Sequence, residues 1–175
     1  MKLIAFAASN SKNSINKQLA TYAGSLAGDV EVEVLDINDY EMPLFSMERE
    51  EELGHPAEAR AFFDKIGNSD GVIISFAEHN GSYTAAYKNL FDWTSRIDQK
   101  VFQNKPMLLL STSPGPGGAS SVLAAAKNSA PYFAGDVRAD LSVPSFYDVF
   151  DAEAQKLTDS ALNDKLMTAV SLLTQ

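Results

Sequence analysis

The stretch KLIAFAASNSKNSIN, residues 2–16, decides how this chain folds. It begins with an almost uninterrupted apolar run, residues 2–8, and passes directly into a loop of hydroxyl and amide side chains. A continuous apolar run of this length is typical of a parallel strand that is covered on both faces. Because the polar loop leads straight into a helical pattern, the stretch indicates the first βα unit of an α/β domain.

The same alternation of an apolar run with a helical pattern recurs along the chain. Residues 71–76 and 106–111 are nearly continuous apolar runs, which predict two further central strands. Residues 30–34 and 137–143 alternate apolar with polar side chains, which predicts edge strands with one polar face. Apolar residues at helical spacing predict five helices, around Ile15 to Leu26, Ala59 to Ile66, Ala86 to Ile97, Val122 to Ala126 and Leu162 to Leu173.

Five strands joined by right-handed helical crossovers give 2-1-3-4-5 as the simplest strand order. This order defines the flavodoxin-like fold, so we expect a three-layer α/β sandwich that forms one domain over residues 1–175. Ligands of such sheets bind beyond the carboxyl ends of the strands, where the strand order reverses. We therefore expect the loops after the first, third and fourth strands to form the functional site.

Composition excludes several classes of function. The chain has no cysteine, which rules out a disulfide framework, a thiolate metal site and a cysteine nucleophile. Its net charge of −9 argues against nucleic acid and against an anionic membrane surface as partners. The apolar stretches are too short for a signal peptide or a bilayer span, so we expect no membrane insertion and a cytoplasmic location.

Three loops carry the candidate chemistry. Residues 9–16 offer hydroxyls, amides and a helix N-terminus to an anion, although Asn13 or Ser14 could serve only as a helix cap. Residues 77–82 are polar, and Gly81 would let the backbone approach a flat ligand. The third loop, residues 111–118, holds five Pro or Gly residues, which indicates either close approach of a ligand or a turn that ends the strand.

Neither the G-x-x-x-x-G-K-[ST] motif nor the G-x-G-x-x-G motif occurs, so the usual sequence support for ATP and for a Rossmann-bound dinucleotide is missing. The three loops together resemble those of the NAD(P)H-dependent FMN reductases, which include flavodoxin-like quinone and azo reductases. The family pattern G-S-x-R-x-x-S-x-N-x-x-L-A runs onto residues 8–20, P-E-Y-N-x-S onto 77–82, and K-N-x-x-D-W onto 88–93. The family's Ser-Pro-Gly-rich loop is matched by residues 111–118.

The chain departs from the family pattern at four positions. Ala8, Ala77 and His79 replace Gly, Pro and Tyr, and Ser11 replaces the usual Arg. The change at Ser11 removes a charged contact to the phosphate. His79 itself either stacks on or hydrogen-bonds a ring, or is a solvated surface residue.

The resemblance implies a non-covalently bound FMN. Its phosphate would lie at Ser9, Ser11, Ser14, Ile15 and Asn16. Its isoalloxazine would meet the second and third loops at Ala77, Glu78, His79, Asn80, Gly81, Ser113, Pro114, Gly115 and Gly118. It also implies NADPH or NADH as co-substrate and ping-pong hydride transfer to a quinone, free flavin or azo compound, with no catalytic side chain and no metal.

Two other functions stay open from the sequence. An electron-carrier flavodoxin would use the acidic surface to dock basic redox proteins, and a flavin-free interaction module would bind no cofactor. An NAD(P)H oxidation assay and a visible spectrum with FMN separate these alternatives from the reductase.

The resemblance also implies that flavin binds near a subunit interface. We expect a homodimer or homotetramer from the helix that carries Leu90, Phe91 and Trp93 and from the apolar loop 40–45, which could instead be an ordinary buried loop. Trp93 is expected in the core or at that interface. Residues 48–52 are expected to be a solvated acidic surface and no metal site.

Overall fold

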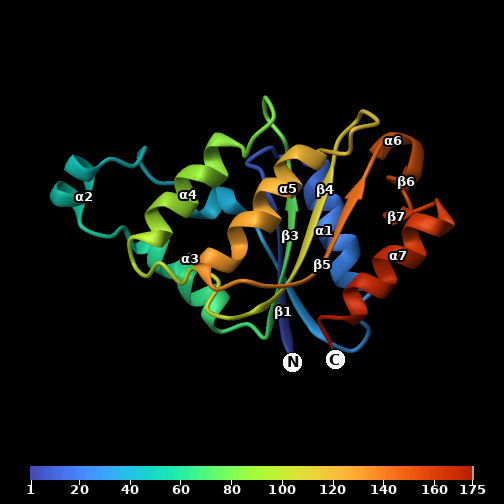
Figure 1. The fold of residues 1–175 in the computed structure, drawn as a ribbon, viewed down its shortest axis with the longest axis horizontal. Helices are drawn as coiled ribbons and strands as arrows, with labels where there is room; N and C mark the ends of the chain where they lie inside the picture. The colour runs from blue at the N-terminus through green and yellow to red at the C-terminus, as the bar shows by residue number, and fades with distance from the viewer. Residues whose placement is uncertain (175) are drawn as a thin grey trace.

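The computed structural model describes residues 1–174 and contains a five-stranded parallel sheet between two layers of helices (Figure 1). The strands lie in the order β2-β1-β3-β4-β5, which confirms the predicted flavodoxin-like order. They are β1 (Lys2–Ala8), β2 (Glu31–Leu35), β3 (Gly71–Phe76), β4 (Pro106–Thr112) and β5 (Asp136–Val143).

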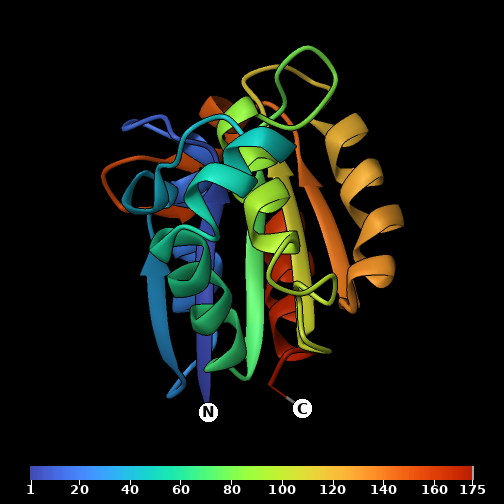
Figure 2. The same cartoon turned by 90° about the vertical axis from the view of Figure 1, so that its left-hand side faces the viewer.

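Two helical layers bury the two faces of the sheet (Figure 2). One face packs against α1 (Ile15–Ser25) and α7 (Ser160–Ser171), with Leu19 and Leu166 in its core. The other face packs against α3 (Ala57–Gly67), α4 (Ala85–Ser95) and α5 (Ser120–Ser129). Every residue of β3 is buried, as the unbroken apolar run predicts for a strand covered on both sides.

The edge strand β5 alternates in burial as predicted, with one local exception, whereas β2 does not, because Val34 is 39% exposed. A bulge between Met107 and Leu108 of β4 shifts the pairing so that Met107 lies opposite Val137, while Leu108 lies opposite Ala139. Val137 therefore packs on the face covered by α3, α4 and α5, whereas Ala139 and its neighbour Leu141 pack on the other face. A strict period of two would put all three on one face.

The five predicted helices are present, but the expected count of five was too low. The structure adds α2 (Met47–Leu53), α6 (Phe146–Val149), two 3-10 turns, η1 (Ile37–Tyr40) and η2 (Ala130–Phe133), and a short hairpin of β6 (Phe150–Asp151) with β7 (Lys156–Leu157). Helix α2 buries no residue, so it has no apolar period to detect. Ser46 caps it instead; Glu48, Glu51 and Glu52 are exposed, and Glu50 pairs with Arg96 at 2.9 Å. None of the helices in residues 1–174 is long and apolar enough to cross a bilayer.

Parallel strands bring the candidate loops to one edge. The loops that follow β1, β3 and β4 gather at the carboxyl edge of the sheet, opposite the N-terminus (Figure 1). The strand order 2-1-3-4-5 places these three strands next to one another in the middle of the sheet. The fold therefore creates the switch-point crevice in which ligands of open α/β sheets bind.

Candidate functional site

The first loop ends at the N-cap of helix α1. Ser14 is the N-cap of α1, and its Oγ accepts a hydrogen bond of 3.1 Å from the N–H of Lys17. The N–H groups of Ile15 and Asn16 precede the regular helical bonding, and no group among residues 1–174 accepts from them. Ser14 is therefore a cap, as the alternative interpretation held, and the Ser14 hydroxyl proton and two backbone donors remain available to an anion.

The side chain of Asn16 is hydrogen-bonded within the protein. The residue is 2% exposed, and its Oδ1 accepts from Ser75 Oγ at 2.7 Å and from Thr112 N at 3.1 Å. Its Nδ2 donates to Thr112 O at 3.2 Å. The amide thus joins α1 to the carboxyl ends of β3 and β4. The Oδ1 atom accepts two hydrogen bonds and Nδ2 uses one of its two N–H groups, so the backbone N–H and the second amide N–H are the donors that Asn16 has left.

Positive charge beside this loop comes from two lysines. Lys17 Nζ lies 2.6 Å from Asp36 Oδ2, and this hydrogen bond holds the pKa of the Asp36 carboxyl below its usual value. The charge of Lys17 is therefore largely matched. Lys12 is exposed next to Ser11 and has no carboxylate partner among residues 1–174. A cation does lie in this loop, one residue beyond the position where the family has arginine.

The second loop is a tight hairpin. His79 and Ser82 exchange backbone hydrogen bonds of 3.0 and 3.2 Å around Asn80 and Gly81, which have φ of 53° and 78°. Positive φ at both central residues is the signature of a type I′ turn, for which Asn-Gly is the preferred pair. The turn alone accounts for Gly81, and an added Cβ there would meet nothing within 4 Å. His79 is exposed at the base of this turn.

Two polar side chains hold the second loop to its neighbours. Thr84 is buried at the N-cap of α4, and its Oγ1 donates to the carbonyl of Ala8 at 3.0 Å, at the end of β1. The carboxylate of Glu78 accepts from the N–H of Val122 at 2.8 Å, in the first turn of α5. A carboxylate at a helix start is favoured by the helix dipole. Glu78 thus points toward α5 and links the second loop to the helix that follows the third.

The third loop is fixed at its end and open in its middle. Gly118 has φ of 58°, and its carbonyl accepts from Ser111 Oγ at 2.7 Å and from Ser142 Oγ at 2.9 Å. Ser113 and Gly115 accept from the N–H groups of Phe146 and Ser145. A Cβ added at Gly115 would meet nothing within 4 Å, so this part of the backbone can be approached closely.

A cleft of about 290 Å³ lies beside the first loop. Its walls are Asn10 of that loop, the segment from Ile37 to Leu44 and the first turns of α4. Asn89 and Trp93 hold this segment: Trp93 Nε1 donates to Pro43 O at 2.7 Å, and Asn89 Oδ1 accepts from Phe45 N at 2.8 Å.

These contacts give Asn89 and Trp93 of the segment 88–93 a role, which is to hold the segment that precedes α2. Trp93 is fully buried, as expected for a core residue. Loop 40–45 is partly buried and partly exposed, because Tyr40 and Met42 lie in the core while Leu44 is 74% exposed.

The structure brings the predicted residues to one edge of the sheet. Ser9 and Ser14 are buried in the first loop, while Ser11, Asn80 and Pro114 are exposed. Two of the predicted residues, Asn16 and Glu78, use their side chains to hydrogen-bond other parts of the chain. The tether formed by Asn89 and Trp93 was missed by sequence reasoning, because its partners lie 44 to 50 residues away.

Residues 1–148 match the sequence profile of the NADPH-dependent FMN reductase family. The chain belongs to this family. The resemblance to this family is thereby confirmed.

Two curated quinone reductases and one solved flavoenzyme structure are similar to this chain. A 2-hydroxy-1,4-benzoquinone reductase of Burkholderia sp is 36% identical over 66% of this chain and 62% of its own length. A quinone reductase of Escherichia coli K12 is 30% identical over 66% of this chain and 61% of its length. The matches therefore span slightly less than two thirds of the length of these two quinone reductases. The flavoenzyme NAD(P)H:(acceptor) oxidoreductase FerB of Paracoccus denitrificans superposes with a TM-score of 0.77 at 25% identity, over 99% of this chain and 95% of that one.

Proposed function

We propose that this chain is an FMN-dependent NAD(P)H oxidoreductase that reduces a quinone, free flavin, azo compound or similar small acceptor. The observation that carries the proposal is the convergence of three loops at the carboxyl edge of β1, β3 and β4, in a chain that belongs to the FMN reductase family. The names of the quinone reductase relatives support a small-molecule acceptor.

The residues present fit FMN in charge and in shape. A phosphate needs donors, and the start of α1 offers the N–H groups of Ile15 and Asn16 and the hydroxyl of Ser14. Lys12 supports the same placement, because it adds an unmatched positive charge to this loop. A flat ring needs a backbone without side chains in the way, and the third loop provides this at Gly115.

A bound FMN would supply two-electron redox chemistry between the nicotinamide and the acceptor. The overall reaction balances, since NAD(P)H plus one proton and a quinone give NAD(P)⁺ and a hydroquinone. The chain's residues orient the reactants and exclude water, and no side chain is assigned an acid or base role. We propose that the cleft between Asn10 and the first turns of α4 admits the second reactant, because it borders the first loop.

Assembly and location are part of the same proposal. We propose a homodimer or homotetramer, supported by the exposed apolar side chains of Leu44, Met47 and Leu53 on one protruding segment (Figure 1). Leu90 and Trp93 no longer support it, because both are buried within the chain. We place the enzyme in the cytoplasm, where NAD(P)H is available.

A steady-state assay under anaerobic conditions tests the function. With excess FMN and 1,4-benzoquinone, the purified chain is expected to oxidise NADH or NADPH faster than the same mixture without protein, because the proposed site would hold flavin within reach of the nucleotide. An electron-carrier flavodoxin would bind FMN but give no such rate. A flavin-loaded chain that is reduced by neither nucleotide contradicts the proposal.

A further inference from the structure

The cleft of about 290 Å³ beside the first loop carries a single formal charge. Its walls combine apolar side chains, among them Ile37, Met42 and Leu90, with three asparagines. Within the described part of the chain, Glu41 is the one charged residue that lines this cleft. Its carboxylate therefore sets the sign of the electric field that a reactant meets there.

No cation matches this carboxylate. Glu41 is exposed and forms no ion pair with any residue among 1–174. The same holds for Asp39, two residues earlier, while Lys17 is already paired with Asp36 at 2.6 Å. The segment 36–41 thus brings two unmatched negative charges to the side of the sheet edge where the cleft lies.

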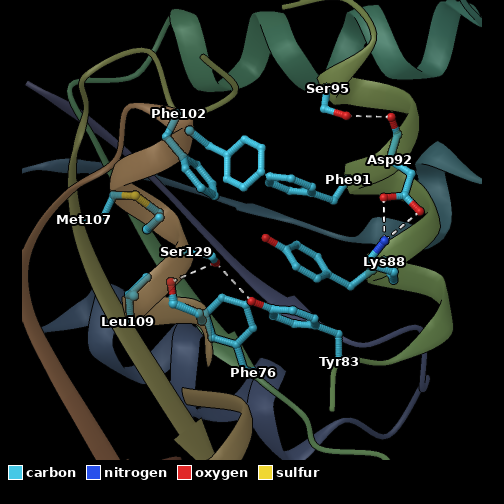
Figure 3. A pocket seen from close by; sticks show the side chains of 14 residues that line it. Phe76, Tyr83, Lys88, Phe91, Asp92, Ser95, Phe102, Met107, Leu109 and Ser129 are labelled. Atoms are coloured by element: carbon cyan, nitrogen blue, oxygen red, sulfur yellow. Dashed lines mark hydrogen bonds and ion pairs between the residues drawn. The ribbon is translucent and has the colours of Figure 1, made fainter. Parts of the chain in front are cut away.

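The cavity between α4 and α5 differs in this respect (Figure 3). Its volume is similar, about 270 Å³, and its two charged lining residues form an ion pair, with Lys88 Nζ 2.7 Å from Asp92 Oδ1. A matched pair of charges exerts little net force on a ligand, whereas a single carboxylate repels an anion. Discrimination by charge is therefore expected in the cleft beside the first loop and not between α4 and α5.

Hydrogen-bond donors around the cleft offset little of the negative charge. Asn89 Nδ2 donates to two backbone carbonyls at 3.2 and 3.1 Å, and Asn38 Nδ2 donates to one carbonyl and one carboxylate at 3.1 and 2.8 Å. The first turn of α4 also borders the cleft, but a helix N-terminus carries only about half an elementary charge. The full charge of Glu41 outweighs it, so an anion is held less well than a neutral molecule of the same shape.

Positive charge lies in a different hollow. Lys12 and Lys17 line a depression beside Ser14, and this depression shares no residue with the cleft. The first loop thus separates the cations on the side of the proposed phosphate from the carboxylate on the side of the proposed second reactant.

We propose that Glu41 makes the cleft selective for neutral acceptors, so that a neutral quinone binds in preference to a sulfonated or carboxylated quinone of the same size. This inference rests on the proposed reductase function, which places the acceptor in the cleft. Glu41 acts on binding through its charge and has no part in the transfer of electrons or protons.

Equilibrium dialysis of the oxidised, FMN-loaded chain without nucleotide measures acceptor binding apart from turnover. Menadione is compared with 1,4-naphthoquinone-2-sulfonate, which has the same ring system and one negative charge. Glu41→Gln should raise the affinity for the sulfonate about three- to fivefold relative to menadione at low ionic strength. In about 1 M salt, where the Debye length is roughly 3 Å, most of this gain should disappear. Glu41→Lys should favour the sulfonate further.

Glu52→Gln is the matched control, because Glu52 is exposed on α2 and lines neither of the two cavities. It should change the ratio of the two affinities by less than about twofold. The proposal is overturned if Glu41→Gln leaves that ratio unchanged, or if Glu52→Gln shifts it equally, since the net charge of the protein would then be responsible. A chain that reduces both quinones without any effect of Glu41 contradicts this inference alone, whereas a chain that binds no FMN contradicts the proposed function.

Discussion

Asn16→Ala is expected to lower the free energy of unfolding by about 2–4 kcal/mol. The change removes three hydrogen bonds at a site that is 2% exposed, and it leaves Thr112 N–H without its acceptor. Because the amide joins α1 to β3 and β4, its loss should loosen the phosphate loop and the third loop together. FMN and riboflavin are therefore both expected to bind more weakly, as measured by flavin fluorescence quenching.

Asn13→Ala is the matched control, because Asn13 is exposed in the same loop. Urea unfolding should find its stability within about 0.5 kcal/mol of the unmodified chain. If Asn16→Ala is as stable as Asn13→Ala, the three hydrogen bonds do not hold the loops. If it weakens FMN but not riboflavin, the side chain binds the phosphate after all.

Gly118→Ala is expected to cost about 2–4 kcal/mol, from the left-handed backbone and a lost hydrogen bond. Gly118 has φ of 58°, and a new Cβ would collide with Ser142 Oγ and lie 3.1 Å from the backbone nitrogen of Pro144. Relief requires Ser142 to turn away, which breaks its bond to the Gly118 carbonyl. Since Gly118 ends the third loop, flavin affinity should fall with stability.

Gly117→Ala tests the same substitution one residue earlier. An added Cβ at Gly117 meets nothing within 4 Å, so thermal unfolding should show a change of less than about 1 kcal/mol. Equal losses for the two variants would show that general stiffening of the loop, and not the collision at Gly118, is responsible.

The fold was predictable where one physical rule dominates. The runs at residues 2–8 and 71–76 became β1 and β3 with the predicted bounds, because strands buried on both faces tolerate almost no polar side chain. Helix α2 escaped detection because none of its residues is buried, so it has no apolar face. The type I′ turn at Asn80 and Gly81 was within reach, since Asn-Gly is the strongest short hairpin signal.

The site was predictable at the level of loops but not of individual side chains. Strand order alone brings the three loops together, so their proximity follows from the sequence pattern. The partners of Asn16 and Glu78 lie 96 and 44 residues away, and no local pattern distinguishes a side chain that ties two loops from one that binds a ligand.

The most direct test of the account is a comparison of FMN with riboflavin, because the two ligands differ only in the phosphate. The purified chain should bind FMN more tightly than riboflavin. Ser14→Ala should weaken FMN at least tenfold, about 1.4 kcal/mol, and riboflavin far less, since the proposed phosphate site includes the lost hydroxyl. Equal affinity of the unmodified chain for the two flavins, or equal weakening of both by Ser14→Ala, would contradict the placement of FMN in these loops.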